Sequence, residues 1–398
     1  MTIEDAPWTG RAGFAALIAA LGGAEQARIV GGAVRDTLLG IDVADIDLAT
    51  RLAPATVLAQ LEAAGIRAVP TGLAHGTITA VLPSGPVEVT TLRRDVSTDG
   101  RHATIAFTDD WREDAARRDF TMNALYADPA TGAVFDYFGG LDDLAARRVR
   151  FIGDPLKRIA EDHLRILRFF RFMARFGDQA DADGLAACAA RARDLMALSR
   201  ERIADELLKL LIVRDAVRVV ALMVERGILL PVLPEIEADG VERLKRLADD
   251  EQAGGIAAHA IRRLAALLPA DPGIAHDIGA RLRLSNAQRK RLESAAMPDR
   301  GDDPRALAYR IGVDAATDRL LLAGRSAAAL DGWTPPRLPI TGGALVARGV
   351  SKGPLVAATL KRIEDAWVAE GFPDEARLSA MVDEAVAQTL TDDSSPNA

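Results

Sequence analysis

Strand-like and helix-like segments alternate only in the first 140 residues of this 398-residue chain. Short runs rich in Val, Ile and Thr lie there between helical patterns, at 28–30, 45–50, 77–82 and 87–92. Residues 141–330 instead carry mostly amphipathic helical patterns, broken at turns rich in Gly and Pro. This distribution predicts an α+β fold, with a mixed sheet in the N-terminal part and helices alone in the rest.

The C-terminal part carries further boundary signals. Three prolines between 333 and 339 are typical of a linker, and a long helix is expected over about 354–370. The polar end, 391–398, is expected to be a loose tail.

Composition excludes several classes of protein. The net charge is −8, and 49% of the residues are hydrophobic, which argues against a disordered chain and against a polycation that binds nucleic acid by bulk charge. The single cysteine, Cys188, leaves no internal disulfide partner and no multi-cysteine zinc site. The N-terminus lacks a signal-peptide pattern and no stretch is apolar enough to span a membrane, so we expect a cytoplasmic protein without a membrane partner.

A first motif combines glycines with paired carboxylates. Gly31–Gly32 lies where a predicted strand passes into a helix, Arg35–Asp36 follows, and Asp45 and Asp47 lie on the next predicted strand. Side chains two apart on a strand share a face, and two carboxylates there suit a divalent cation bound with phosphate oxygens. For an isolated Asp-x-Asp pair a solvated strand edge is the commoner explanation. The upstream glycines and arginine favour phosphate binding.

A second motif places Arg117, Arg118 and Asp119 before an apolar stretch that contains Asn123. One interpretation is an ordinary helix N-terminus capped by Asp119. The other is a grip on a nucleotide, with guanidinium groups on phosphates and the carboxylate accepting from a ribose hydroxyl. These residues alone favour the helix cap.

A third motif lies on a helix predicted over about 155–175. Helical spacing places five charged side chains on one face: Arg158, Glu161, Asp162, Arg165 and Arg168. A solvated face with ion pairs is the default explanation. However, residues 157–175 hold six basic and two acidic side chains, a local +4 within an acidic chain. Asp162 and Arg165 offer an acceptor and a donor fork that suit a base edge.

Four segments in this order resemble the motifs of the class II tRNA nucleotidyltransferase and poly(A) polymerase family, within the DNA polymerase β-like nucleotidyltransferase superfamily. They are residues 30–50, 117–125, 154–168 and 199–207. The resemblance implies a catalytic head with a mixed sheet (1–140), a helical neck that carries the nucleotide-selecting helix (141–215), a helical body (216–332) and a helical tail that contacts tRNA (333–398).

The resemblance also implies the roles of single residues. Asp45 and Asp47 would hold two Mg²⁺ ions at an RNA 3′-hydroxyl and the α-phosphate, and Glu88 is a candidate third carboxylate. The triphosphate would be organised by Gly31, Gly32, Arg35 and Asp36, and Arg117 and Arg118 would contact phosphates or position the nucleotide. Asp119, supported by Asn123, would recognise the ribose. The bases of CTP and ATP would be read by Asp162 and Arg165, with Glu161 orienting Arg165 and Arg168 beside them.

Among the activities of the family, we expect CCA addition to tRNA from CTP and ATP. The segment 93–107, which contains residues 99–103, resembles the flexible loop region of CCA-adding members, although an ordinary mobile loop has the same composition. Enzymes that add only CC or only A share these motifs and remain alternatives. The acidic end of the chain disfavours a poly(A) polymerase, and Asp45 and Asp47 disfavour a non-catalytic RNA-binding protein.

Overall fold

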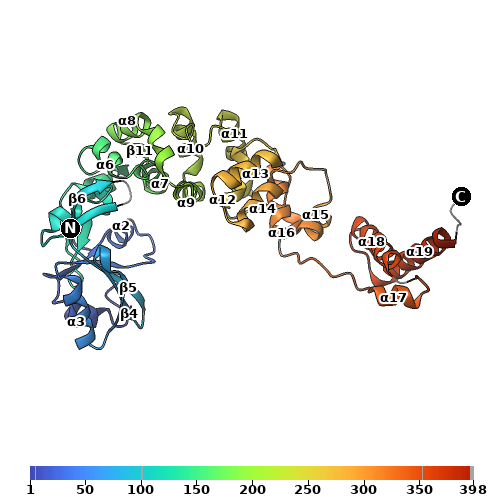
Figure 1. Ribbon diagram of the computed structural model, residues 1–398, viewed down its shortest axis with the longest axis horizontal. Helices are drawn as coiled ribbons and strands as arrows, with labels where there is room; N and C mark the ends of the chain where they lie inside the picture. The colour runs from blue at the N-terminus through green and yellow to red at the C-terminus, as the bar shows by residue number, and fades with distance from the viewer. Residues whose placement is uncertain (5, 100–101, 352, 395–398) are drawn as a thin grey trace. The chain divides into compact units, whose positions relative to one another are not determined.

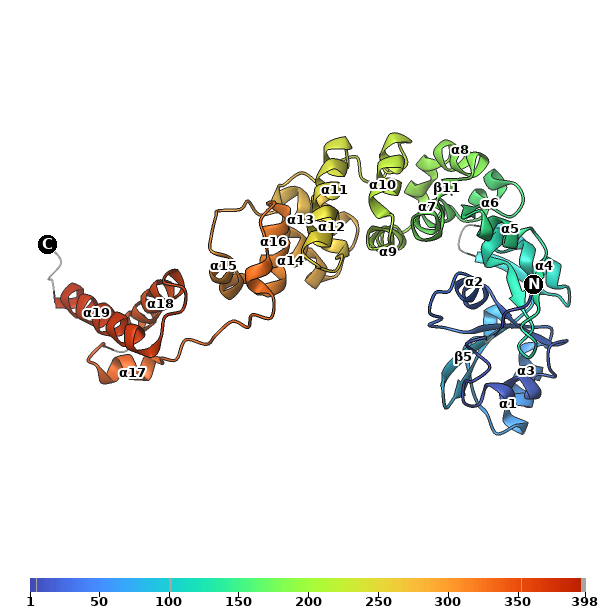
Figure 2. The same ribbon diagram turned by 180° about the vertical axis from the view of Figure 1, so that it is seen from behind.

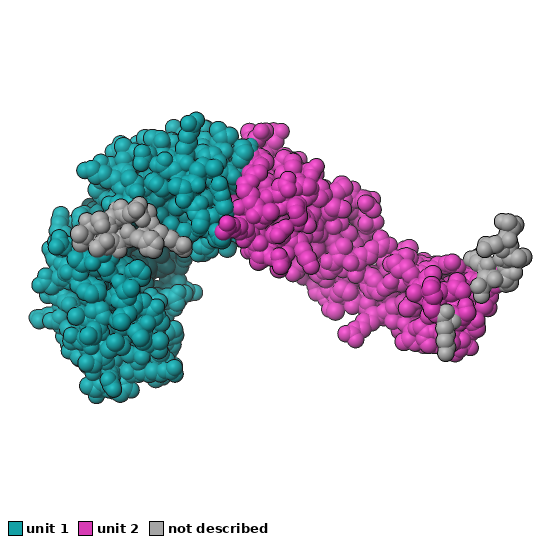
Figure 3. Space-filling model, viewed as in Figure 1, with its two compact units in different colours: residues 1–234 teal, residues 235–398 magenta. Residues whose placement is uncertain are grey.

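The computed structural model describes residues 1–4, 6–99, 102–351 and 353–394. The chain forms two compact units, Met1–Pro234 and Glu235–Ala398 (Figure 3). Unit 1 contains a mixed sheet followed by helices, whereas the described part of unit 2 is made of helices and turns (Figure 1). The α+β class is therefore confirmed, while the boundaries expected at 140, 215 and 332 stay predictions.

A seven-stranded sheet forms the N-terminal part of unit 1. Its order is β3-β4-β5-β2-β1-β8-β9, and β2 runs parallel to β5 while the other neighbours are antiparallel. The parallel pair places Asp47 directly opposite Glu88. The strands are β1 (Ala27–Val30), β2 (Asp47–Thr50), β3 (Arg67–Gly72), β4 (Thr77–Leu82), β5 (Gly85–Thr91), β8 (Leu125–Ala127) and β9 (Val134–Asp136).

The helices of unit 1 follow two patterns. Short helices connect and cover the strands, and α1 packs beside α3 (Figure 2). They are α1 (Phe14–Ala20), α2 (Gly32–Leu38), α3 (Pro54–Ala63), η1 (Leu73–His75), α4 (Trp111–Ala116), η2 (Thr121–Asn123) and α5 (Gly140–Ala145). A helical stack follows, consisting of α6 (Pro155–Glu161), α7 (Arg165–Phe176), α8 (Ala182–Ala190), η3 (Ala192–Ala197), α9 (Arg200–Leu211) and α10 (Ala216–Glu225).

The prediction of a single helix over 155–175 is wrong, because the helical conformation is interrupted at Asp162. This residue adopts an extended conformation (φ −153°, ψ 107°), and α7 begins only at Arg165. The Asp162 carboxylate accepts the backbone N–H of Leu164 at 3.1 Å, a local bond that competes with continued helix. The inference that Asp162 and Arg165 share one helical face is therefore wrong as well.

Three other expectations need correction. The strand expected from Asp45 begins at Asp47, although both side chains are exposed and Ile46 between them is buried. Asp119 caps no α-helix, since a 3₁₀ turn and strand β8 follow it. At the other end, α19 continues to Ser394, so the loose tail does not begin at 391.

Seven of the described strands were not predicted. Three of them, β3, β8 and β9, belong to the seven-stranded sheet. β6 (Arg93–Asp99) and β7 (His102–Phe107) form an antiparallel pair, in the region expected to be a flexible loop. Residues 100 and 101 of that loop lie outside the described residues. β10 (Arg148–Val149) and β11 (Gln179–Ala180) form a small parallel pair beyond residue 140, where helices alone were expected.

Aromatic side chains join the sheet region of unit 1 to α7. Phe120 packs against Phe151 and Phe172 with ring centroids 5.0 and 5.2 Å apart, and Phe151 stacks on Phe169 at 5.4 Å. All four rings are buried. Such aromatic packing adds about 0.5–1.5 kcal/mol per pair beyond the burial of apolar area, so it fixes α7 against the turn at 120–123.

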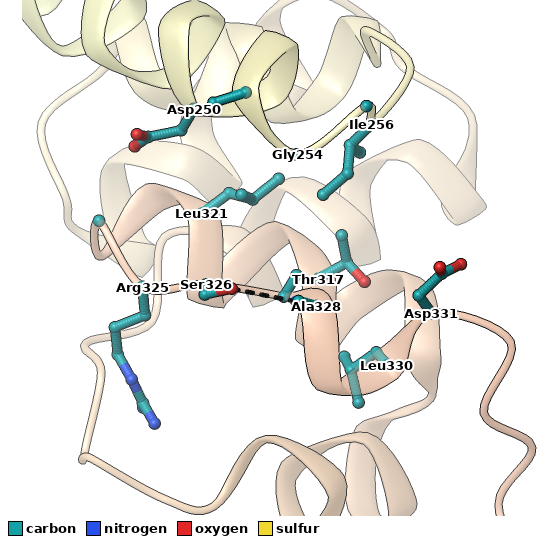
Figure 4. Close-up of a pocket in the computed structure, with 14 residues that line it drawn as sticks. Asp250, Gly254, Ile256, Thr317, Leu321, Arg325, Ser326, Ala328, Leu330 and Asp331 are labelled. Carbon is teal, nitrogen blue, oxygen red and sulfur yellow. Dashed lines mark hydrogen bonds between the residues drawn. The ribbon is translucent and has the colours of Figure 1, made fainter.

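Unit 2 contains α11 (Ala238–Ala253), α12 (Ala260–Leu267), α13 (Pro272–Arg281), α14 (Asn286–Ala295), α15 (Pro304–Ile311), α16 (Val313–Leu322), η4 (Ala328–Leu330), α17 (Gly342–Ala347), α18 (Pro354–Ala369) and α19 (Glu375–Ser394). Buried ion pairs link its helices, because Arg262 contacts both Glu251 at 2.7 Å and Asp318 at 3.2 Å. A cavity of about 730 Å³ lies between the ends of α11 and α16 and the turn before η4 (Figure 4).

The single cysteine and the apolar character of the helices can be described from the structure. Cys188 is free and buried in α8, and burial raises the pKa of its thiol. Across the residues that the structure describes, no helix combines the length and the apolar character that a bilayer crossing requires.

A glycine at the start of α5 gives a test of this packing. A Cβ atom at Gly140 would lie 2.4 Å from the Thr121 carbonyl oxygen, whereas one at Gly10 would meet nothing within 4 Å. We expect Gly140→Ala to lower the free energy of unfolding by about 1–3 kcal/mol, because backbone must move to relieve the overlap. Gly10→Ala is the control, and equal urea midpoints for the two variants would contradict this packing.

Candidate nucleotide-binding site

A pocket of about 410 Å³ in unit 1 brings most of the candidate residues together. Ten of its eleven lining residues belong to the motifs singled out in the sequence, and Phe172 is the eleventh. They come from segments that are far apart in the chain: Gly31, Gly32, Arg35, Asp47, Arg118, Asp119, Asn123, Asp162, Arg165 and Arg168. The pocket therefore joins the strand edge, the turn at 119–123 and the start of α7.

Three carboxylates lie at the strand edge beside this pocket. Asp47 is at the start of β2, opposite Glu88 on β5, and Asp45 precedes it. Although the Asp47 side chain is partly exposed, its partial removal from water raises its pKa, and the Glu88 and Asp45 carboxylates raise it further, whereas Arg118 lowers it. Mutual repulsion of this kind is relieved by a bound cation.

The carboxylates do not form a complete cage. In the described ranges, no group of three or more His, Cys, Asp or Glu side chains is close enough to hold a metal ion by itself. A cation at Asp45 and Asp47 would need further oxygen ligands from a substrate, and phosphate oxygens are the kind that Mg²⁺ accepts.

A glycine turn forms the wall next to the carboxylates. Gly31 has φ 71° and ψ −119°, a conformation in which only glycine is unstrained. A Cβ there would lie 3.3 Å from Nη1 of Arg118. The turn thus lets an arginine approach the backbone closely.

A chain of hydrogen-bonded side chains links α2 to α7 across the pocket. Arg35 is buried and donates to Asn123 Oδ1 at 2.5 Å, and Asn123 Nδ2 donates to Asp119 Oδ1 at 2.9 Å. The other oxygen of Asp119 accepts two bonds from Arg168, at 2.6 and 2.9 Å. Burial tends to raise the pKa of Asp119, but Arg168 and Asn123 hold it below its usual value, so this carboxylate is ionised.

Asp114 in α4 is a central residue of the site that the sequence analysis missed. It is buried, contacts Arg117 at 2.8 Å and Arg118 at 3.2 Å, and accepts the Tyr126 hydroxyl at 2.6 Å. Burial favours its neutral form, yet the two arginines and the tyrosine lower its pKa to about 2. Its spacing of three and four residues from the arginines is the signal that predicts such contacts on a helix.

The turn between α6 and α7 is held from several sides. Asp162 Oδ2 accepts from Arg202 of α9 at 2.8 Å, and Arg165 donates to Glu161 and to the Arg158 carbonyl. Arg158 also donates to the carbonyls of residues 117 and 118. Arg202 and Arg158 act across 40 residues of sequence, and no local pattern points to such partners.

Some candidate residues lie beside the pocket instead of lining it. Asp36 contacts Arg35 at 2.7 Å, Arg117 is directed to Asp114, and Glu161 is directed to Arg165. Asp45 and Glu88 also lie outside the lining. These side chains can act on a ligand through their neighbours or, for the carboxylates, through a cation.

The larger cavity in unit 2 is a weaker candidate. Its polar lining includes Asp250, Asp331 and Arg325, and Arg325 is already paired with Asp299 at 2.9 Å (Figure 4). It presents no set of cations for a phosphate group. The pocket in unit 1 is smaller but has four guanidinium groups in its lining.

Two families match parts of the first 239 residues. Residues 27–150 match the family described as poly A polymerase head domain, and residues 181–239 match a probable RNA and SrmB-binding site of polymerase A. The first match contains Asp45, Asp47 and the turn at 119–123.

Relatives and solved structures extend the likeness to most of the chain. The human mitochondrial CCA tRNA nucleotidyltransferase 1 is 35% identical over 373 residues, which cover 88% of this chain and 84% of that protein. A CCA-adding enzyme of Anoxybacillus flavithermus is 37% identical over 55% of this chain and 54% of its own length. The structure of the Bacillus stearothermophilus CCA-adding enzyme in complex with CTP has a TM-score of 0.72 at 26% identity, covering 92% of this chain and 94% of that chain.

The Asp114 contacts predict a loss of stability when the charge is removed. We expect Asp114→Asn to lower the free energy of unfolding by about 3 kcal/mol, because two partly buried guanidinium groups lose their shared counter-ion. Asp109→Asn, which changes an exposed carboxylate in the same region, is the control and should behave as the wild type.

The same contacts predict a pH dependence. The ionised form of Asp114 stabilises the fold above its unfolded pKa of 3.8, and this contribution is lost as the pH falls toward the folded value of about 2. The difference in unfolding free energy between wild type and Asp114→Asn should narrow by about 2 kcal/mol from about pH 5 to about pH 2. A difference that stays constant over this range in urea titrations would contradict the assignment.

Proposed function

Since this chain belongs to the class II tRNA nucleotidyltransferase and poly(A) polymerase family, we propose that the pocket of unit 1 is the site at which it transfers nucleotides to RNA. The chain adds CCA to the 3′ end of tRNA from CTP and ATP, the activity that its relatives carry in their names. The pocket would hold the incoming nucleotide, with its triphosphate toward β2 and its base toward α7.

One observation carries this assignment. The pocket lining combines Asp47 and Arg118 with Asp162 and Arg165. The first two groups suit a metal-bound triphosphate, whereas a carboxylate with a guanidinium fork suits the hydrogen-bonding edge of a base. Asp119 belongs to the same lining, and a ribose hydroxyl would donate to it.

The family uses divalent metal ions, and we assign Mg²⁺ to Asp45 and Asp47. The fit rests on the donor set, which consists of hard carboxylate oxygens; partial removal from water and repulsion by the neighbouring carboxylates raise the pKa of Asp47. The bound ion would supply Lewis-acid activation and neutralise phosphate charge. Glu88 is the candidate for a third carboxylate, since it pairs with Asp47 across the sheet.

The protein's own residues orient the reaction. Arg118, held by Asp114, would stabilise negative charge that develops on the phosphates while the RNA 3′-hydroxyl attacks the α-phosphate and pyrophosphate leaves. Asp162 and Arg165 would select C and A by hydrogen bonds to the base, in place of a nucleic-acid template. Most of the catalytic effect then comes from positioning.

Extension of a truncated tRNA tests the activity directly. A tRNA that lacks its last three nucleotides is incubated with the protein, Mg²⁺ and CTP alone, ATP alone or both, and the products are sequenced. We expect CC with CTP alone and CCA with both nucleotides. A product of CC only or A only, with both nucleotides present, would assign a partial activity. No incorporation at all would contradict the assignment of this chain as an enzyme.

Removal of one proposed metal ligand gives a sharper test. We expect Asp45→Ala to reduce incorporation at least 1,000-fold, because the cation at the reacting phosphate loses a ligand. Asp42→Ala removes an exposed carboxylate from the same loop and should keep wild-type activity. Unfolding midpoints equal to the wild type would show that the fold is intact, and retained turnover by Asp45→Ala would remove this residue from the metal site.

Arg165 tests the selection of the base. We expect Arg165→Ala to lower the preference for CTP and ATP over UTP and GTP by about 10- to 100-fold, since a bidentate contact with a base contributes about 1–3 kcal/mol. Binding of tRNA should change much less. Lys157→Ala removes an exposed cation from the preceding helix and serves as the control. An unchanged preference would assign Arg165 to a purely structural ion pair with Glu161.

The cytoplasmic location remains a prediction from the sequence. Among the relatives, the human protein is mitochondrial by name. Fractionation of cells that express the tagged full-length chain decides this point.

A further inference from the structure

His163 lies in the turn between Asp162 and Arg165, but its side chain does not line the pocket. Its Nδ1 atom faces Oδ2 of Asp194, in η3, at 3.7 Å. Both atoms are shielded from solvent, and neither has a hydrogen-bond partner within the described part of the chain. The Nε atom of Arg191 lies 2.8 Å from the same oxygen and balances its charge.

This contact links the turn to η3. On one side, Asp162 is bound by Arg202 of α9 at 2.8 Å. Within the turn, the Asp162 carboxylate accepts the N–H of Leu164. On the η3 side, the His163 side chain contacts Asp194.

The turn needs such support because it interrupts a helix. The backbone of Asp162 is extended, so α6 does not continue into α7. Within the turn, the Arg165 N–H donates to the Asp162 carbonyl at 3.0 Å, and side-chain contacts from α9 and η3 tie the turn to the neighbouring helices. A shift of about 1 Å at a binding group is enough to weaken positioning strongly.

We propose that His163 is a positioning residue for nucleotide selection, which acts through Asp194 to hold the turn that aims Asp162 and Arg165 into the pocket. An imidazole with its proton on Nδ1 would donate to the Asp194 carboxylate once a small movement of either side chain shortens the 3.7 Å separation. This inference rests on the proposed function of the pocket. It adds to the nucleotide-selecting residues one that does not contact the nucleotide itself.

Steady-state kinetics on the truncated tRNA test the proposal. We expect His163→Ala to raise KM for CTP and ATP about tenfold and to increase misincorporation of UTP and GTP, with kcat within about twofold of wild type. His163→Asn keeps an N–H donor in the place of Nδ1 and should restore most of the wild-type KM. A merely structural role would lower kcat equally for every nucleotide and leave KM unchanged, and that result would overturn the proposal.

A double-mutant cycle tests the partner. Asp194→Ala should raise KM as His163→Ala does, and the double variant should add nothing further, because both changes remove the same contact. His276→Ala is the matched control, since it breaks a histidine–carboxylate contact of 2.9 Å with Glu293 in unit 2 and should leave KM unchanged.

Additive effects of the two changes, or a wild-type KM in His163→Ala, would overturn the positioning role. Failure of the wild-type protein to incorporate any nucleotide would instead contradict the function of the pocket, so the two failures are distinguishable.

Discussion

The ion pair between Asp119 and Arg168 is the contact on which the site depends. It joins the turn that follows Arg118 to the helix α7, with two hydrogen bonds to one carboxylate oxygen. The other oxygen fixes Asn123, which in turn accepts from the buried Arg35. Loss of this pair would leave the largely buried Asp119 carboxylate without its cation, at the joint where the aromatic cluster around Phe120 also packs.

The arginines around the pocket are held by carboxylates before any ligand binds. Asp114 fixes Arg118, Glu161 fixes Arg165, and Glu206 contacts Arg168 at 3.7 Å. Such preorganisation reduces the cost of ordering side chains when a nucleotide enters. It also explains how a chain of net charge −8 handles RNA: cations are concentrated at one site, and their acidic partners keep them in place. Binding of tRNA should accordingly depend on salt.

The α+β class was predictable from the sequence. Ten of the pocket residues were also predicted, because glycine turns, paired carboxylates and arginine clusters are local patterns. Prediction from the sequence failed where long-range contacts decide the local structure. The break at Asp162 follows from a bond to Leu164 and from Arg202, forty residues away, whereas the helical periodicity around it runs on without interruption. The contact between His163 and Asp194 is of the same kind. Asp114 was predictable from its spacing to Arg117 and Arg118, but its burial was not.

The central claim is that one pocket in unit 1 binds both nucleotides. Titration calorimetry of CTP, alone and in the presence of saturating ATP, tests it most directly, with Arg168→Ala as the variant that breaks the central ion pair. We expect a single CTP site that ATP blocks completely, and we expect the affinities for CTP and for ATP to fall by a similar factor in Arg168→Ala. Undiminished CTP binding in saturating ATP, or a loss confined to one nucleotide in the variant, would contradict it.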